Sequence, residues 1–301
     1  MTSPCKIAGW EFFNGNVGKA DDVGAVVFEQ LGDDDRTAAE LFINALSGRR
    51  RVIDIGCGGG FPGLHVAAHV GEIIGVDAAP NVVSAGQANL RSLGVQNMSI
   101  AHAAAESLPF ADAEFDGAML CGVLESMDWE SVPRAISEAR RVLAPGGRIA
   151  VLDQDWAEVI SRKPACETQI RFEDGRLTYF TVERHLSPHR ERCTWYVIDP
   201  GSASGIKLRA ELGERKRVPA SLGLGDIDDS AALDAWYDET AQFDVDTLIE
   251  LVASNGFGDV RARSLPIWGQ KIVFATAVKL ESEDLLDSDL RVSRRDRPGD
   301  I

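Results

Sequence analysis

The sequence predicts an α/β protein, with a doubly wound, mostly parallel sheet and a small inserted α+β unit. Three observations predict this class. Short apolar runs alternate with helical patterns of roughly 8–14 residues, which is typical of βαβ units and a parallel sheet. The first apolar run leads into a glycine-rich loop. The alternation stops between residues 164 and 230 and then resumes, which indicates an insertion.

The first half of the chain supplies most of the predicted sheet. Each expected strand is a short apolar run, and each expected helix is bounded by turn residues. Helix 37–46 is ended by Ser47 and Gly48, and helix 80–93 is closed by Gly94. The expected order is helix 37–46, strand 52–55, helix 63–70, strand 73–76, helix 80–93, strand 99–101, strand 117–120, helix 131–143 and strand 148–152.

The pattern changes after the fifth strand. Segments 170–172 and 177–182, joined by an Asp174-Gly175 turn, predict a β-hairpin, and 193–198 is the candidate third antiparallel strand. Residues 199–230 are rich in glycine, serine and charge, so we expect a loop or lid there. We interpret the whole insertion as a cap that binds a substrate.

Alternation resumes with a helix at 245–254 and two closing strands at 260–265 and 271–278. The charged C-terminal segment is expected to be disordered. The expected division of the chain is an N-terminal aromatic segment or lid at 1–36, a core at 37–163 and 231–280, a cap at 164–230, and a disordered tail at 281–301.

Composition excludes several classes of protein. The net charge of −16 argues against a nucleic-acid partner, because phosphate binding needs a basic surface. No run of about 18 apolar residues occurs, and the first residues lack the features of a secretion signal. The five cysteines are scattered without a CxxC pair, so neither a disulfide framework nor a metal site is expected. We therefore expect a cytoplasmic protein, monomeric or homodimeric, without integral membrane segments.

The stretch 51–60 is the most informative part of the chain. Its apolar run ends in Asp54, and glycines then fill four of the next six positions. Glycine permits a sharp loop and lets the backbone approach a ligand without Cβ atoms in the way. The stretch therefore predicts a ligand site directly after the first strand.

The loop can be read in two frames. Gly58, Gly60 and Gly63 match the dinucleotide fingerprint GxGxxG. That fingerprint should begin where the strand ends, at Gly56, and in this frame Phe61 takes the place of the third glycine. Read from residue 54, the loop is instead Asp-x-Gly-x-Gly-x-Gly.

Four later segments agree with the second frame. Together with 54–60 they resemble motif I and the following segments of the class I S-adenosylmethionine-dependent methyltransferases, in particular the small-molecule members called type 11 and quinone-methyltransferase-like. The resemblance implies a Rossmann-like, doubly wound, mostly parallel seven-stranded sheet with a final antiparallel strand. It covers residues 37–156 and 243–279. The four segments are 75–77, 104–110, 115–125 and 140–148.

The resemblance implies S-adenosyl-L-methionine as the cofactor and assigns residues to it. Asp54 and the glycine loop would hold its methionine part, and Asp77 its ribose. Ala104 departs from the family, which usually has an aspartate there for the adenine amino group, so Glu106, Ser107 or water would substitute. The implied cofactor-binding residues are Asp54, Gly56, Cys57, Gly58, Gly60, Asp77, Ala78, Ala105, Glu106, Leu120 and Cys121.

The acceptor side is expected at the ends of the fourth and fifth strands and in the insertion, because ligands of open α/β sheets bind there. The candidate general bases have a plainer interpretation as helix caps or solvated histidines. The plainer interpretation of the candidate pocket aromatics is that they form the core of the small sheet. The candidate bases are Asp153, Asp155, His185 and His189. The candidate substrate residues are Phe12, Phe13, Trp156, Tyr179 and Trp195.

These features together predict an enzyme that transfers a methyl group from S-adenosylmethionine to an oxygen, nitrogen or carbon atom of a small molecule, in specialised metabolite biosynthesis. A quinone, isoprenoid or lipid acceptor is an open variant. A second hypothesis is a cyclase or decarboxylase that binds the same cofactor without methyl transfer, since fold and motif do not separate these. A third is a non-catalytic interaction protein.

Overall fold

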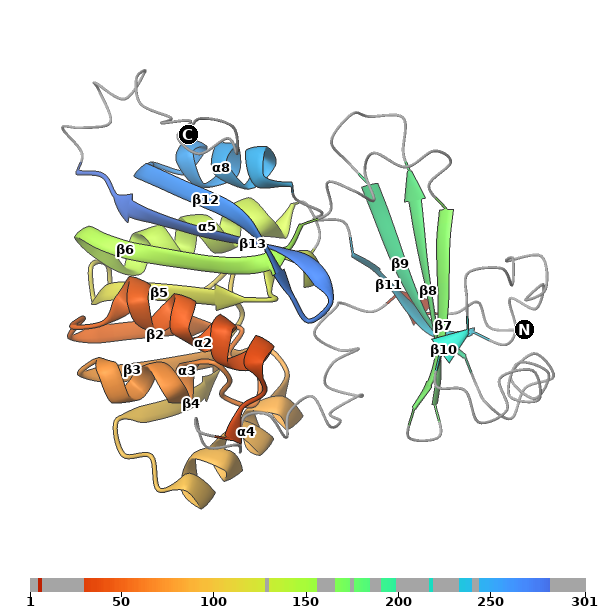
Figure 1. The fold of residues 1–301 in the computed structure, drawn as a ribbon, viewed down its shortest axis with the longest axis horizontal. Coiled ribbons are helices and arrows are strands. Elements are labelled where there is room, and N and C mark those ends of the chain that lie inside the picture. The colour runs from red at the N-terminus through yellow and green to blue at the C-terminus, as the bar shows by residue number, and fades with distance from the viewer. Residues whose placement is uncertain are drawn as a thin grey trace.

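The computed structural model describes residues 30–127, 130–155 and 244–281 in full, and the backbone pairing of strands 5–6, 166–173, 176–184, 191–198, 217–218 and 233–239. These residues form two sheets, one of seven strands and one of six (Figure 1). No described helix is both long and apolar enough to cross a membrane.

The seven-stranded sheet has the order β12-β13-β6-β5-β2-β3-β4. Strands β2 to β6 run parallel to one another, and β13 is antiparallel to both β6 and β12. This confirms the predicted fold class, a mostly parallel sheet closed by an antiparallel strand. The strands are β2 (Arg51–Ile55), β3 (Glu72–Asp77), β4 (Met98–His102), β5 (Phe115–Cys121), β6 (Leu143–Gln154), β12 (Phe257–Ile267) and β13 (Gln270–Lys279).

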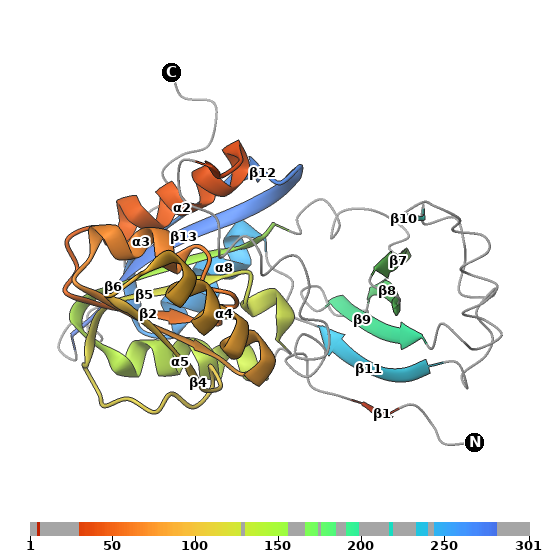
Figure 2. The ribbon, with the colours of Figure 1, turned by 90° about the horizontal axis from the view of Figure 1, so that it is seen from below.

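Helices cover both faces of this sheet, as Figures 1 and 2 show. Alternation along β2 explains why: Val52 packs with the helices of one face and Ile53 with those of the other. One face carries α2 (Asp33–Leu46), α3 (Gly63–Val66) and α4 (Pro80–Leu93), and the other carries α5 (Ser131–Val142) and α8 (Val245–Ser254).

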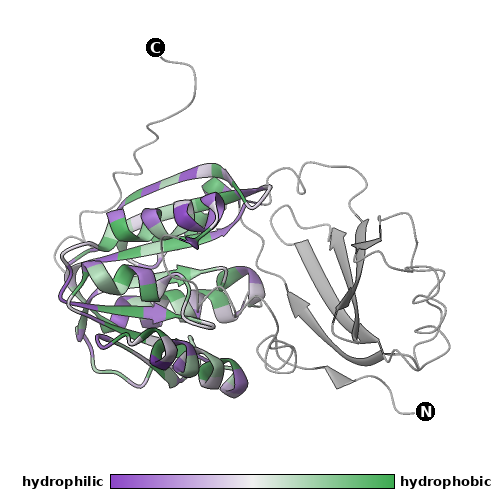
Figure 3. Ribbon diagram, turned by 60° about the horizontal axis from the view of Figure 1, so that its bottom comes forward, coloured by the Kyte–Doolittle hydropathy of each residue, from purple (hydrophilic) through white to green (hydrophobic). Residues whose placement is uncertain are grey.

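Each helix is held by an apolar stripe. In α5, the buried residues Val132, Ala135, Ile136 and Ala139 recur at helical spacing. Figure 3 shows hydrophobic and hydrophilic residues mixed along these helices, as expected where one side meets the sheet and the other meets water. The predicted helix 63–70 divides into α3 and a short 3₁₀ helix, η3 (Ala67–His69). A second one, η4 (Leu124–Ser126), follows β5 and was not predicted.

The six-stranded sheet has the order β1-β11-β9-β8-β7-β10. Strands β7 (Cys166–Glu173) and β8 (Arg176–Arg184) form the predicted hairpin, and β9 (Glu191–Ile198) is the predicted third strand. Three strands come from outside those segments: β1 (Cys5–Lys6), β10 (Arg217–Val218) and β11 (Leu233–Glu239). β11 lies in the section 231–280 assigned to the core, yet it pairs with β9.

Candidate functional site

The glycine loop begins directly after β2 and ends where α3 starts. Its glycines 56, 58 and 60 have φ angles of 70°, 53° and 107°, which side-chain-bearing residues rarely adopt. The backbone N–H groups of Gly56 and Cys57 donate to the carbonyl oxygen of Val76 at 2.7 and 3.0 Å. These bonds fasten the loop to the end of β3.

The strand end decides between the two reading frames. β2 ends at Ile55, so Gly56 is the first residue of the loop and Phe61 takes the third glycine position of the dinucleotide fingerprint. At Gly58, no described heavy atom lies within 4 Å of the place where a Cβ would stand. Space therefore remains beside the Cα atom of Gly58, and the strand end fits the frame that starts at Asp54.

Asp77 ends β3 and faces the loop. Its Oδ2 accepts the N–H of Gly58 at 3.1 Å, and its Oδ1 accepts the N–H of Ala79 at 2.9 Å. Burial raises the pKa of Asp77, and these backbone N–H groups oppose the rise. The carboxylate is thus held in one orientation between the loop after β2 and the start of α4.

Asp54 lies under the loop and is 1% exposed. A Cβ on Gly63 would collide with its carboxylate, so glycine at the start of α3 makes room for the acid. Burial, and then the charge of Asp77, raise the pKa of Asp54 well above its ordinary value. Among the described residues, none forms a hydrogen bond with its Oδ2. An ionised carboxylate oxygen that is buried without a donor is costly in a folded protein, which agrees with the raised pKa of this group.

The segment after β4 lies beside Asp77. The N–H of Ala103 donates to the carbonyl oxygen of Asp77 at 3.0 Å. Ala104 and Ser107 then form an antiparallel bridge, which makes a tight turn with Ala105 and Glu106 at its centre. The segment predicted to receive adenine thus begins beside Asp77, the residue predicted to bind the ribose.

The ends of β5 and β6 are tied together by two carboxylates. Asp153 is 1% exposed, and its oxygens accept the N–H groups of Leu124 at 3.1 Å and Glu125 at 3.3 Å. Glu125 in turn accepts the N–H of Gln154 at 3.3 Å. Asp153 therefore caps η4, which supports its interpretation as a cap over that as a general base. Asp155 is also buried, and its N–H donates to the carbonyl oxygen of Lys271 at 2.8 Å.

The turn after β5 also meets the glycine loop. A Cβ on Gly56 would run into the side chain of Val123. Leu120 packs its side chain into the core, so only its main chain could serve a ligand. Burial raises the pKa of the Cys57 and Cys121 thiols well above their ordinary values, so both favour the neutral form. Neither thiol is suited to act as a nucleophile.

The structure brings together all of the predicted cofactor residues at the carboxyl ends of β2, β3, β4 and β5. Most of the candidate acceptor residues are not among the residues that it describes. Tyr179 and Trp195 lie on the neighbouring strands β8 and β9, where Trp195 stands opposite Phe180. The remaining candidates, His185, His189, Phe12, Phe13 and Trp156, lie outside the described residues.

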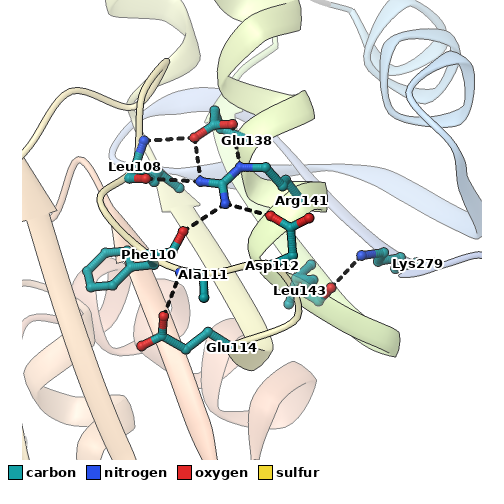
Figure 4. A network of polar contacts seen from close by, with 9 residues as sticks. All are labelled: Leu108, Phe110, Ala111, Asp112, Glu114, Glu138, Arg141, Leu143 and Lys279. Carbon is teal, nitrogen blue, oxygen red and sulfur yellow. Dashed lines mark hydrogen bonds and ion pairs between the residues drawn. The ribbon is translucent and has the colours of Figure 1, made fainter.

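Two supports of the site were not predicted. The side-chain amide of Asn89 on α4 donates to the carbonyl oxygen of Gly59 at 2.9 Å and steadies the glycine loop. Arg141 and Glu138 on α5 form a network with the loop that follows β4 (Figure 4). Their spacing of three residues on a helix indicates an ion pair, but no sequence pattern indicates its contact with a distant loop.

Known proteins resemble this arrangement in sequence and fold. Residues 52–147 match the family model of a methyltransferase domain. An uncharacterized methyltransferase of Bacillus subtilis, YcgJ, is 36% identical over 103 residues, which are 34% of this chain and 40% of that protein. The 2-phytyl-1,4-naphtoquinone methyltransferase of Synechocystis is 33% identical over 107 residues, which are 34% of this chain and 44% of that protein.

The chain thus spans less than half of the length of these curated relatives. A crystal structure of an S-adenosylmethionine-dependent methyltransferase from Clostridium acetobutylicum has the same fold. Its TM-score is 0.54 at 9% identity, and the match covers 90% of this chain and 99% of that one.

Proposed function

We propose that this chain, whose core is a class I S-adenosylmethionine-dependent methyltransferase domain, binds S-adenosyl-L-methionine and transfers its methyl group to a small molecule. The observation that carries the proposal is the open space beside Gly58 next to the carboxylate of Asp77, which accepts the N–H of Gly58 at 3.1 Å. Dinucleotides such as NAD use the same pair of features, but their fingerprint needs a glycine at the position that Phe61 occupies here.

The residues present fit the cofactor. Each oxygen of Asp77 already accepts one backbone N–H, and a carboxylate oxygen has a second lone pair, so both can still accept ribose hydroxyls. In the glycine loop, the space beside Gly58 is open, and we propose that the methionine part of the ligand lies there. Asp54 lies buried beside the start of α3, and we retain it as a support of the loop that would hold the methionine part.

When bound, S-adenosylmethionine supplies an electrophilic methyl group on a sulfonium centre. The chain itself would contribute orientation and a dry environment. Asp153 and Glu125 fix the turn after β5, so that backbone groups near Cys121 keep their place beside the glycine loop. A general base is needed only if the acceptor must lose a proton, and we retain His185 and His189 as candidates for it.

We place the acceptor beyond the carboxyl ends of the strands. The chain leaves the core there after Asp155, forms most of the six-stranded sheet, and returns at α8. Tyr179 and Trp195 on that sheet, with Phe12, Phe13 and Trp156, are the residues we propose for the acceptor pocket. The net charge of −16 disfavours nucleic acid as the acceptor. The acceptor atom would be oxygen, nitrogen or carbon, and a quinone is one variant, since one relative is named for a naphthoquinone. We further propose a cytoplasmic monomer or homodimer.

A methyl-transfer assay tests this function. The full chain, S-adenosylmethionine and a panel of phenols, amines, quinones and carbon acids would be incubated and read by mass spectrometry. We expect one class of acceptor to gain the mass of a CH₂ group, with S-adenosylhomocysteine released in equal amount. Cofactor binding with a rearranged or decarboxylated product of unchanged methyl count would favour the cyclase or decarboxylase hypothesis. Absence of cofactor binding would contradict both.

A further inference from the structure

The loop between β4 and β5 is held against α5 by one arginine. Arg141 forms a two-point ion pair with Glu138 on the same helix, at 2.7 and 2.8 Å. Its remaining N–H groups donate to the carbonyl oxygens of Leu108 at 2.9 Å and Phe110 at 2.7 Å, and to the carboxylate of Asp112 at 2.9 Å. Every N–H group of the guanidinium therefore has an acceptor. Figure 4 shows the side chain at the centre of this network.

The contact is reciprocal, which makes it a clamp. Glu138 accepts the N–H of Leu108 at 2.8 Å, and the carbonyl oxygen of Arg141 accepts the N–H of Ala113 at 3.0 Å. The side chains of Glu138 and Arg141 thus bind the backbone of Leu108, before Pro109, and Arg141 also binds that of Phe110, after it. The hydrogen bond from Arg141 holds the pKa of Glu138 below its usual range.

The clamped loop begins at the cofactor site. Ala103, at its start, donates to the carbonyl oxygen of Asp77, and the tight turn 104–107 follows at once. The clamp acts on the next residues, 108–113. The turn therefore lies between two fixed points, the end of β3 on one side and α5 on the other.

We propose that Arg141 and Glu138 are positioning residues that hold the turn 104–107 in the conformation that receives the adenine base. This inference rests on the proposed function for the identity of the ligand. The guanidinium fork matters more than its charge, because a lysine ammonium cannot reach the two carboxylate oxygens and two carbonyl oxygens together. Neither residue belongs to the proposed cofactor-binding set, and both contact the loop, so both act through it.

The test compares Arg141→Lys with Arg140→Lys. Arg140 is the neighbouring residue, and its Nε donates to the carbonyl oxygen of Gly256 at 3.2 Å, away from the loop, so the same substitution there is a matched control. Calorimetry would measure the binding of S-adenosylhomocysteine and of S-inosylhomocysteine, which differs from it only in the base. Glu138→Gln is a second, isosteric variant in case the lysine variant folds poorly.

We expect the wild-type chain and Arg140→Lys to prefer the adenine ligand. In Arg141→Lys and Glu138→Gln the Kd for that ligand should rise by about tenfold if the competent loop conformation falls to about a tenth of the population. The Kd for the inosine analogue should change less, so discrimination between the bases should shrink. At saturating cofactor, kcat should stay within about twofold while KM for the cofactor rises.

Hydrogen exchange of peptides covering 104–112 in the ligand-free chain gives an independent readout, and Arg141→Lys should speed it. An equal loss of affinity for both ligands would show a merely structural role and overturn the inference. Unchanged affinity, or unchanged exchange, would overturn it as well. If the wild-type chain binds neither ligand, the proposed function fails instead, and faster exchange in Arg141→Lys would still show the clamp.

Discussion

At the scale of single residues, the site depends on carboxylates whose surroundings give them different tasks. Asp77 accepts backbone N–H groups from two loops and keeps lone pairs for a ligand. Asp54 is buried under the glycine loop, and its Oδ2 has no hydrogen-bond partner among the described residues. The first acid is suited to bind while ionised. The second keeps its proton to a higher pH than an exposed aspartate does, because burial raises its pKa.

Asp77→Ala should weaken cofactor binding. Each charge-assisted hydrogen bond lost is worth about 1.5–3 kcal/mol, so the Kd should rise by roughly ten- to hundredfold or more. Asp116→Ala is the matched control, because Asp116 also accepts two backbone N–H groups, those of Arg50 and Arg51, at the opposite end of the sheet. It should lower stability and leave the Kd unchanged. Calorimetry that finds equal affinities for wild type and Asp77→Ala would contradict the assignment.

Asp54 should give the ligand-free chain a distinct pH dependence. Its pKa is raised by burial, so the folded state binds its proton more tightly than the unfolded state does. Its stabilising contribution is then complete below the ordinary aspartate pKa and is lost as pH rises through the raised folded pKa. Relative to Asp54→Asn, the wild-type chain should lose unfolding free energy across that range. Urea titrations at several pH values check this, and parallel curves for the two proteins would refute it.

At the scale of elements, the loops after β2, β4 and β5 converge because each is tied to a neighbouring strand or helix. The loop after β2 is bound to the end of β3, and the turn after β5 is bound to the end of β6 through Asp153. The segment after β4 is bound to β3 at Asp77 and to α5 by the clamp. The site is therefore a set of loops on a rigid sheet rather than one flexible loop.

Asp153→Asn separates capping from catalysis. An amide can replace only one of the two acceptors that Leu124 and Glu125 use, so a buried N–H loses its partner. Unfolding free energy should fall by about 1–3 kcal/mol. If Asp153 is a cap, the pH profile of kcat should keep its shape, even where the rate falls. Loss of the acidic limb of that profile, where the rate rises as the base loses its proton, with unchanged stability, would instead identify a general base.

Gly86→Ala should destabilise the protein, although alanine normally stabilises a helix relative to glycine. Alanine in place of glycine inside a helix normally stabilises by about 1 kcal/mol. Here a Cβ would stand 2.7 Å from the side chain of Ile100 and 2.9 Å from the carbonyl oxygen of Gly58. It would push α4 away from the glycine loop, so both thermal stability and cofactor affinity should fall. A more stable variant with unchanged affinity would show that α4 does not hold the loop.

At the scale of the whole molecule, the sequence predicted the core far better than the second sheet. Strand β2 and helix α4 were predicted to within about one residue at each end, because apolar runs and Gly94 mark their limits locally. Strand β11 was missed, since its place depends on pairing with β9, more than thirty residues away in sequence. For the same reason the cofactor residues were predictable from local motifs, whereas the bonds of Asp153 and Arg141 were not.

Calorimetric titration of the full chain with S-adenosylmethionine and, separately, with NAD⁺ identifies the ligand of the glycine loop. Both ligands suit a glycine loop after a first strand, and the two reading frames of that loop distinguish them. With β2 ending at Ile55 and Asp77 fixed against Gly58, we predict saturable binding of S-adenosylmethionine and none of NAD⁺. Binding of NAD⁺, or no binding of S-adenosylmethionine, would contradict the account.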